Sequence, residues 1–194
     1  VDREVSDDKR MVPPTALYIR AVPQGAGALP KQPEPVFTHR GGDVWFEMSP
    51  VAWSEDGRHY SFATWEREKE LLRVYLGRAD EQAKPEVVIE RRGDVGHEVV
   101  SVLNPQFTPD GKTLVTVLDE AGWRQPYALD LASKQVRPLL RGEFEAHQVL
   151  GFTPDSKALF VLANKDDLAA MNVYRADMAS GQMQALGQAP DYHR

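Results

Sequence analysis

One short phrase occurs three times along this chain, and it constrains the fold more than any other feature. Each copy has an aromatic residue, a hydroxyl residue, a variable position, an aspartate and then glycine or serine. The copies are Trp53-Ser-Glu-Asp-Gly57, Phe107-Thr-Pro-Asp-Gly111 and Phe152-Thr-Pro-Asp-Ser156. Their aspartates lie 54 and 45 residues apart. Self-similarity at such a spacing indicates a series of equivalent supersecondary units.

The phrase has the composition of a tight turn between two strands. In residues 107–111 the proline presets φ for the second position of a type I turn, and aspartate suits the third. Glycine then accepts the positive φ that leads into the next strand. An apolar run of strand length follows every copy, which is typical of a hairpin. The runs are Tyr60-Ser-Phe-Ala63, Leu114-Val-Thr-Val117 and Leu159-Phe-Val-Leu162.

A second phrase follows the first in each unit. Tyr127-Ala-Leu-Asp-Leu-Ala-Ser-Lys-Gln135 and Tyr174-Arg-Ala-Asp-Met-Ala-Ser-Gly-Gln182 share Tyr, Asp, Ala, Ser and Gln in register. Looser copies begin at Val74 and Leu17. We interpret this phrase as a third strand that runs into a turn, after which a fourth strand follows. Candidates for the fourth strand are residues 35–38, 86–90, 136–140 and 182–186.

Four short antiparallel strands in units of about 45 to 50 residues indicate the blades of a β-propeller. We therefore predict an all-β fold in which 1–194 form a single partial propeller of about three and a half four-stranded antiparallel blades. Whole blades are expected at about residues 41–92, 93–142 and 143–188, and 14–40 are expected to form the outer half of another.

This blade count favours a piece of a larger propeller, because closed rings need at least four blades. A small, complete four-bladed ring is the alternative. An open array leaves apolar faces and strand edges uncovered, so we also expect the isolated chain to self-associate.

Composition and net charge limit the classes of partner that the chain can bind. The hydrophobic content of 42% and the charged content of 27% are those of a folded domain. A net charge of −6 argues against nucleic acid and against anionic membranes as partners, and no apolar stretch reaches membrane-spanning length. Because the chain has no cysteine, disulfides, thiolate metal sites and a cysteine nucleophile are excluded. None of these properties fixes the cellular compartment.

No pattern in the chain points to a catalytic or metal site. It has no Gly-x-Ser-x-Gly segment, and Gly25-Ala-Gly27 lacks the third glycine of a dinucleotide loop. At Asn164-Lys-Asp-Asp167 a cation site is the alternative to a solvated hairpin loop, which we favour. The histidines, none of them paired at i, i+4, are His39, His59, His97, His147 and His193. We predict no catalytic residue, no metal and no cofactor, and leave the substrate-binding residues unassigned.

A charged stretch at residues 66–70 lies between the second and third strands of its blade. We expect an exposed hairpin tip, and the alternative is a rim whose carboxylate binds a substrate amino group. Large aromatic residues at the hairpins, Trp65 and Trp123, are expected to wedge against a neighbouring blade. The aromatic residues ahead of the three turns, Trp53, Phe107 and Phe152, are expected in the blade core.

Two further motifs carry a family resemblance. The turn at 107–111 is followed by Asp119-Glu-Ala-Gly-Trp-Arg-Gln-Pro-Tyr127 and then by Arg141-Gly-Glu-Phe-Glu145. Together these segments are similar to late propeller blades of the prolyl oligopeptidase family of serine peptidases. The dipeptidyl peptidase IV branch is the nearest match, most strongly over 101–187 and more loosely over 14–100. The aspartate turn also occurs in TolB-like propellers, so a binding propeller that serves as a protein-interaction scaffold is the alternative.

The resemblance implies a serine peptidase of two domains. In that family a C-terminal α/β-hydrolase domain carries a Ser-Asp-His triad, and the propeller restricts access to short peptides. The implied partners are that hydrolase domain and a peptide substrate, and no triad residue is carried over to this chain. The dipeptidyl branch also has an adjacent Glu-Glu pair before a Trp-Ser turn, whereas here Glu47 stands alone before Trp53. Bacterial relatives are often exported, which favours the periplasm.

Overall fold

The computed structural model describes residues 13–20, 34–41, 46–80, 84–93, 104–120 and 122–187. Within these ranges the chain is built of β-strands, apart from one three-residue 3₁₀ helix, η1 (Arg67–Lys69). The all-β prediction is therefore confirmed.

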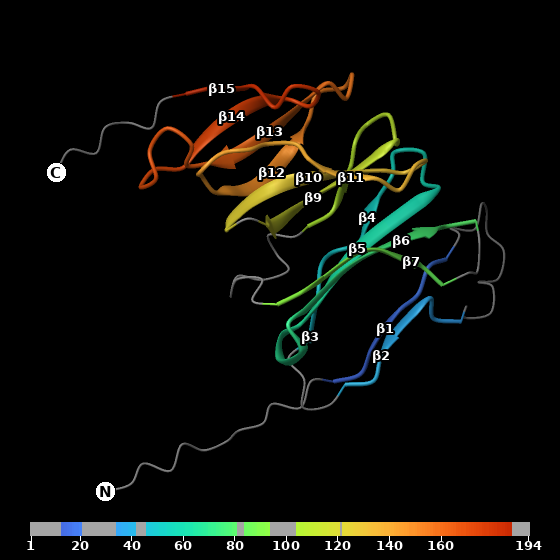
Figure 1. The fold of residues 1–194 in the computed structure, drawn as a ribbon. Helices are drawn as coiled ribbons and strands as arrows, with labels where there is room; N and C mark the ends of the chain where they lie inside the picture. Colours follow the sequence, from blue (N-terminus) through green and yellow to red (C-terminus); the bar gives the residue numbers. More distant parts are fainter. Residues whose placement is uncertain are drawn as a thin grey trace, which may run out of the picture.

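Four antiparallel sheets follow one another along the chain (Figure 1). The first sheet pairs β1 (Thr15–Leu17) with β2 (Phe37–His39). The second has the order β3 (Phe46–Met48), β5 (His59–Glu66), β6 (Leu71–Arg78), β7 (Glu86–Arg92), and β4 (Ala52–Trp53) also pairs with β5. The third contains β8 (Gln106–Phe107), β9 (Thr113–Glu120), β10 (Trp123–Asp130) and β11 (Val136–Pro138). The fourth contains β12 (Ala146–Phe152), β13 (Ala158–Ala163), β14 (Asn172–Asp177) and β15 (Met183–Ala185).

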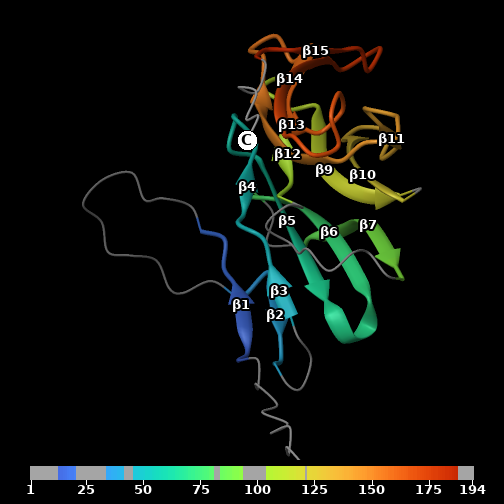
Figure 2. The ribbon, with the colours of Figure 1, turned by 90° about the vertical axis from the view of Figure 1, so that its left-hand side faces the viewer.

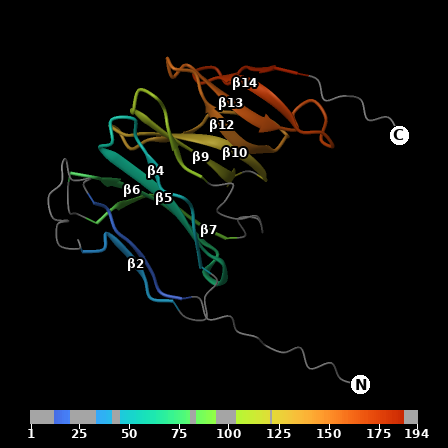
Figure 3. The same ribbon diagram turned by 180° about the vertical axis from the view of Figure 1, so that it is seen from behind.

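The sheets are arranged as successive propeller blades. Seen from the front and from behind, they fan out from the blue two-stranded sheet at one end to the red fourth sheet at the other (Figures 1 and 3). After a quarter turn, the blue strands stand beside the second sheet, and the fan remains open (Figure 2). The predicted fold, an unclosed run of four-stranded antiparallel blades, is confirmed.

The thrice-repeated phrase forms the same hydrogen-bonded turn in all three larger sheets. In each copy the hydroxyl donates to the aspartate carboxylate at 2.6 Å and accepts the N–H of the residue five positions later. The carboxylate also accepts the N–H two positions later. The hydroxyl's hydrogen bond is the main cause that lowers the pKa of Asp56, Asp110 and Asp155. The recurring hydroxyl therefore satisfies the polar groups of the turn.

The last residue of each turn has a left-handed backbone. Gly57 and Gly111 have φ of 68° and 66°, and Ser156 has φ of 58° in the third copy. A side chain at such a φ is strained, so glycine is the expected residue. The Ser156 hydroxyl accepts a hydrogen bond from the Asp110 backbone N–H at 3.0 Å, which joins the turns of neighbouring blades. This bond offsets part of the cost of the side chain.

We predict that Ser156→Ala lowers the free energy of unfolding by about 1 kcal/mol, because it removes the bond to Asp110 and keeps the strain. Ser156→Gly loses the same bond but relieves a strain of about 1 kcal/mol, so it should be more stable than the alanine variant. Urea denaturation gives the order of stability. An alanine variant as stable as the parent would mean that the bond between the turns contributes nothing.

The apolar core lies between consecutive sheets. On β5, Tyr60 and Phe62 pack towards the two-stranded sheet, whereas Trp65 belongs to a cluster shared with Leu118 of the third sheet. On β9, Val115 packs into the cluster shared with the fourth sheet. The strands thus use their alternating faces to cover both neighbours. Trp65 wedges between two blades, as predicted.

One prediction about the core is wrong. Phe107 is buried and Phe152 packs against the cluster between the third and fourth sheets, but Trp53 is 46% exposed. Trp53 lies on the two-residue strand β4, opposite Tyr60 of β5, and belongs to none of the apolar clusters between the described sheets. The indole consequently lies against the Tyr60 ring, with ring centroids 5.7 Å apart, and keeps its other side in solvent.

The fourth sheet turns a partly apolar face away from the third. Leu159 and Val161 on β13 are buried in the inter-sheet cluster, so the alternating residues Phe160 and Leu162 point to the opposite face. Both are only half-buried, and Val173 on β14 lies opposite Leu162. Leu150 and Leu186, on or next to the outer strands of this sheet, are 47% and 52% exposed. This end of the array therefore exposes large apolar side chains.

Candidate functional site

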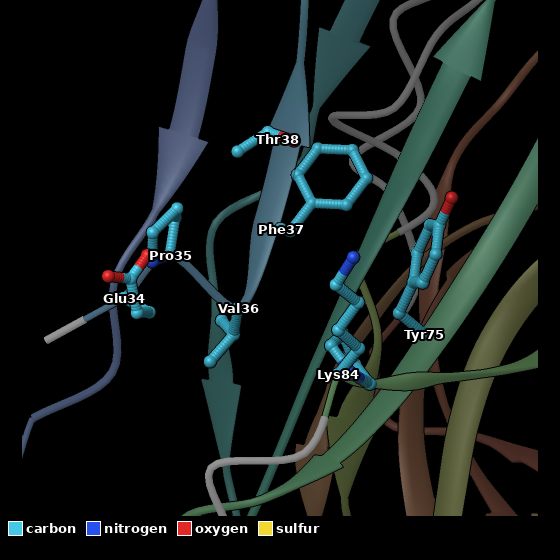
Figure 4. Close-up of a pocket in the computed structure, with 8 residues that line it drawn as sticks. Glu34, Pro35, Val36, Phe37, Thr38, Tyr75 and Lys84 are labelled. Atoms are coloured by element: carbon cyan, nitrogen blue, oxygen red, sulfur yellow. The ribbon is translucent and has the colours of Figure 1, made fainter.

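A groove runs along β2, between the two-stranded sheet and the second sheet. It has two halves of about 450 Å³ each, which share Phe37, Thr38 and Tyr75. We call it the β2 groove. In one half, the Phe37 and Tyr75 rings are in edge-to-face contact, and the Lys84 side chain lies beside them (Figure 4). The further lining of that half is Glu34, Pro35, Val36 and Pro85. The other half is lined by His39, Arg40, Gly41, Phe46, Thr64, Glu66, Lys69 and Arg73.

Aromatic rings form the wall of the β2 groove. The Phe37 ring is edge-on to Phe62 and Tyr75, with centroid distances of 5.2 and 5.3 Å. The His39 ring stacks on Phe46 at 3.9 Å with an interplanar angle of 6°. His39 Nδ1 accepts a hydrogen bond from the Gly41 N–H at 3.2 Å, so the neutral imidazole carries its proton on Nε2. The wall therefore combines apolar surface with a hydrogen-bond donor.

The charged hairpin at 66–70 contributes to the groove an ion cluster around one buried carboxylate, that of Glu66. Glu66 is only 7% exposed, and its carboxylate lies 2.5 Å from Lys69 Nζ and 3.5 Å from Arg73 Nη1. Arg73 Nε also donates to Glu90 at 2.8 Å, which raises the pKa of Arg73 and lowers that of Glu90. The rest of the described tip is exposed, as expected for a hairpin end. Because the Glu66 carboxylate already pairs with two cations, it does not need a substrate amino group to neutralise its charge.

The remaining candidates lie apart from one another. The His59 ring is near Phe107, with centroids 6.5 Å apart, and His147 lies half-buried in β12. Asn164 accepts the Glu145 N–H at 2.7 Å and donates to the Leu168 carbonyl at 3.1 Å, so it holds its hairpin loop. Trp123 is half-buried at the start of β10. His97, His193 and Gly25-Ala-Gly27 lie outside the described residues.

The described ranges contain no group of three or more His, Cys, Asp or Glu side chains that could hold a metal ion. They also contain no helix with the length and apolar character needed to cross a membrane.

The motifs that carried the family resemblance meet between the third and fourth sheets. Arg124 donates to Glu145 Oε2 twice, from Nε at 2.9 Å and from its backbone N–H at 3.1 Å. Gln125 Nε2 donates to the Phe144 carbonyl at 2.7 Å. Gly142 has φ of 140°, and a Cβ there would lie 2.7 Å from the Phe144 ring. The two motifs therefore form a clamp that fixes the connection from one blade to the next.

We predict a coupling of about 1 kcal/mol between Arg124 and Glu145, because each side chain is about one quarter exposed and solvent screens the pair. The double-mutant cycle of Arg124→Met and Glu145→Gln, followed by urea denaturation, measures it. The same cycle on the exposed pair Lys165–Asp166 is the control and should give almost no coupling. Equal values for both cycles would contradict a clamp.

The comparison with protein families decides the classification. The family described as "Dipeptidyl peptidase IV (DPP IV) N-terminal region" matches residues 46–193, which is more than half of the chain. The chain belongs to this family. The resemblance to prolyl oligopeptidase-type propellers, drawn above from the two motifs, is confirmed. A search of curated proteins finds no match.

Solved structures show the same fold at low sequence identity. Porphyromonas gingivalis dipeptidyl peptidase 4 aligns with 92% of the chain at a TM-score of 0.62 and 14% identity. TolB from Acinetobacter baumannii aligns with 81% at 0.57 and 22% identity, and puromycin hydrolase with 73% at 0.57 and 20% identity. At these identities the likeness establishes the fold alone. The chain covers 28%, 35% and 22% of these three proteins, so it corresponds to a part of each.

Sequence reasoning did not single out the groove-lining residues Phe37, Phe46, Arg73 and Lys84, and it treated His39 only as one scattered histidine. Phe46 and Arg73 belong to one sheet and Phe37 and His39 to another, so no spacing along the chain brings them together. The one available signal was the charged stretch at 66–70, which does lie at the groove.

Proposed function

We propose that this chain is the non-catalytic propeller part of a serine exo- or oligopeptidase, similar to dipeptidyl peptidase IV. Its role is to gate and position peptide substrate for a separate α/β-hydrolase domain. The observation that supports this most is the family match over 46–193, on a chain whose family motifs build a clamp between blades.

Bonds between the blades suit such a role, because a gate must hold its shape. Gln106 Nε2 donates across the blade boundary to the Val149 carbonyl at 2.7 Å. Arg137 Nη2 donates to the Met178 carbonyl at 3.1 Å. With the apolar clusters between the sheets, these bonds favour a rigid array that can border a narrow channel and limit substrates by size.

A binding propeller without chemistry of its own is the second candidate. The structural likeness to TolB from Acinetobacter baumannii favours it. In that case the chain would serve as a scaffold for protein partners, and no hydrolase domain would accompany it.

The test uses the complete protein that contains this chain. Expressed from its full reading frame and treated with a fluorophosphonate, it should become labelled on one serine of a Gly-x-Ser-x-Gly segment outside residues 1–194. A serine activated by a neighbouring general base reacts rapidly with this reagent, whereas an ordinary serine hydroxyl does not. No labelling, together with no such segment in the reading frame, would reject the peptidase and favour the scaffold.

We also propose that the isolated chain self-associates through the apolar end of the array. Light scattering should then give a mass above the 21.8 kDa of one chain, rising with concentration. The double variant Leu150→Lys and Leu186→Lys should shift the mass towards the monomer, because both side chains are about half exposed on the fourth sheet. Leu168→Lys, on an exposed loop, is the matched control. A monomer at all concentrations would contradict this proposal.

A further inference from the structure

We propose that the β2 groove is a binding site for peptides that carry a carboxylate next to an aromatic or large apolar side chain. This inference rests on the proposed function, because it names the class of peptide that the propeller positions.

The charge of the groove is opposite to that of the chain. The whole chain has a net charge of −6, yet basic side chains outnumber acidic ones among the described residues that line the groove. The basic side chains are Arg40, Lys69, Arg73 and Lys84, and the acidic ones are Glu34 and Glu66. A concave surface with apolar walls concentrates such a field and attracts a ligand of opposite sign.

The one buried acid in the groove is already neutralised. Glu66 contacts both Lys69 and Arg73, and Arg73 contacts Glu90 as well. Lys69 keeps its side chain 55% exposed, so its ammonium can bind a second carboxylate from solvent. Arg40 and Lys84 are exposed at the two halves of the groove. These three cations present the positive charge to a ligand.

The walls of the groove determine which kind of side chain can lie next to the carboxylate of the ligand. The contacting rings of Phe37 and Tyr75 line both halves, and the stacked pair of His39 and Phe46 lines one half. Aromatic walls of this kind bind a ring or an aliphatic side chain by packing. The Nε2–H of His39 and the hydroxyl of Thr38 add hydrogen-bonding groups for a peptide backbone.

The dimensions suit a short peptide. Each half of the groove has a volume of about 450 Å³, within the range typical of sites for small organic ligands, and both halves have Phe37, Thr38 and Tyr75 in their lining. A groove that follows a strand favours an extended ligand of a few residues. An inorganic anion would leave the aromatic walls uncovered.

The test compares acetyl-Phe-Glu-amide with acetyl-Phe-Gln-amide, which have nearly the same shape and differ by one charge. Titrations of the ¹⁵N-labelled chain followed by NMR should give a dissociation constant about 10-fold lower for the glutamate peptide at low salt. The preference should shrink as salt is raised, because the cations are exposed and screened. Equal binding of the two peptides, or binding of neither, would overturn the inference.

Variants test whether the preference for the glutamate peptide arises in the β2 groove. In the double variant Arg40→Gln and Lys69→Gln the ratio of the two constants should fall towards one, while Glu66 keeps Arg73 as a partner. Lys165→Gln is the control, since it removes an exposed lysine from the fourth sheet's hairpin loop, away from the groove, and should keep the ratio. Unchanged circular dichroism establishes that each variant is folded. A preference that survives in the groove variant would also overturn the inference.

The outcomes separate this inference from the proposed function. Labelling of a serine in the complete protein without any preference for the glutamate peptide rejects the inference alone. A preference that depends on Arg40 and Lys69 in a protein without a reactive serine rejects the peptidase alone, and leaves a peptide-binding scaffold.

Discussion

The described sheets bury their side chains against one another, and the packing between sheets is the interaction on which the rest of the structure depends. A single sheet of short strands has no interior, so its side chains become buried only when another sheet lies on each side. The clusters around Phe62, Leu118 and Val161 each draw residues from two successive sheets. The stabilising contacts therefore lie at the boundaries between blades. A substitution at one boundary should first destabilise the two sheets that meet there.

The polar contacts of the chain strengthen these same boundaries. Arg124 and Glu145 clamp one connection, Gln106 donates to a carbonyl of β12 in the next blade, and Ser156 joins two turns. Because these bonds are directional, they set the angle between blades that apolar packing alone leaves loose. The residues that carried the family resemblance are thus explained by assembly of the array, and their presence says little about chemistry.

The turns and strands were largely predictable from the sequence, because each depends on residues close together in the chain. The positive φ at Gly57 and Gly111 and the strand after each turn follow from turn composition. The position of Trp53 was not predictable, since its burial depends on which side chains from other strands pack against the indole. The β2 groove was not predictable either, because Phe37 and Arg73 belong to different sheets and come together only when the sheets pack.

The half-exposed indole of Trp53 can serve as an optical reporter of blade assembly. The chain has four tryptophans, so a variant in which the other three are replaced by phenylalanine isolates its emission. That emission depends on the polarity around the ring, which packs against Tyr60 on one side and is about half exposed. A strand that covered the indole would exclude water from it and shift its fluorescence to shorter wavelength.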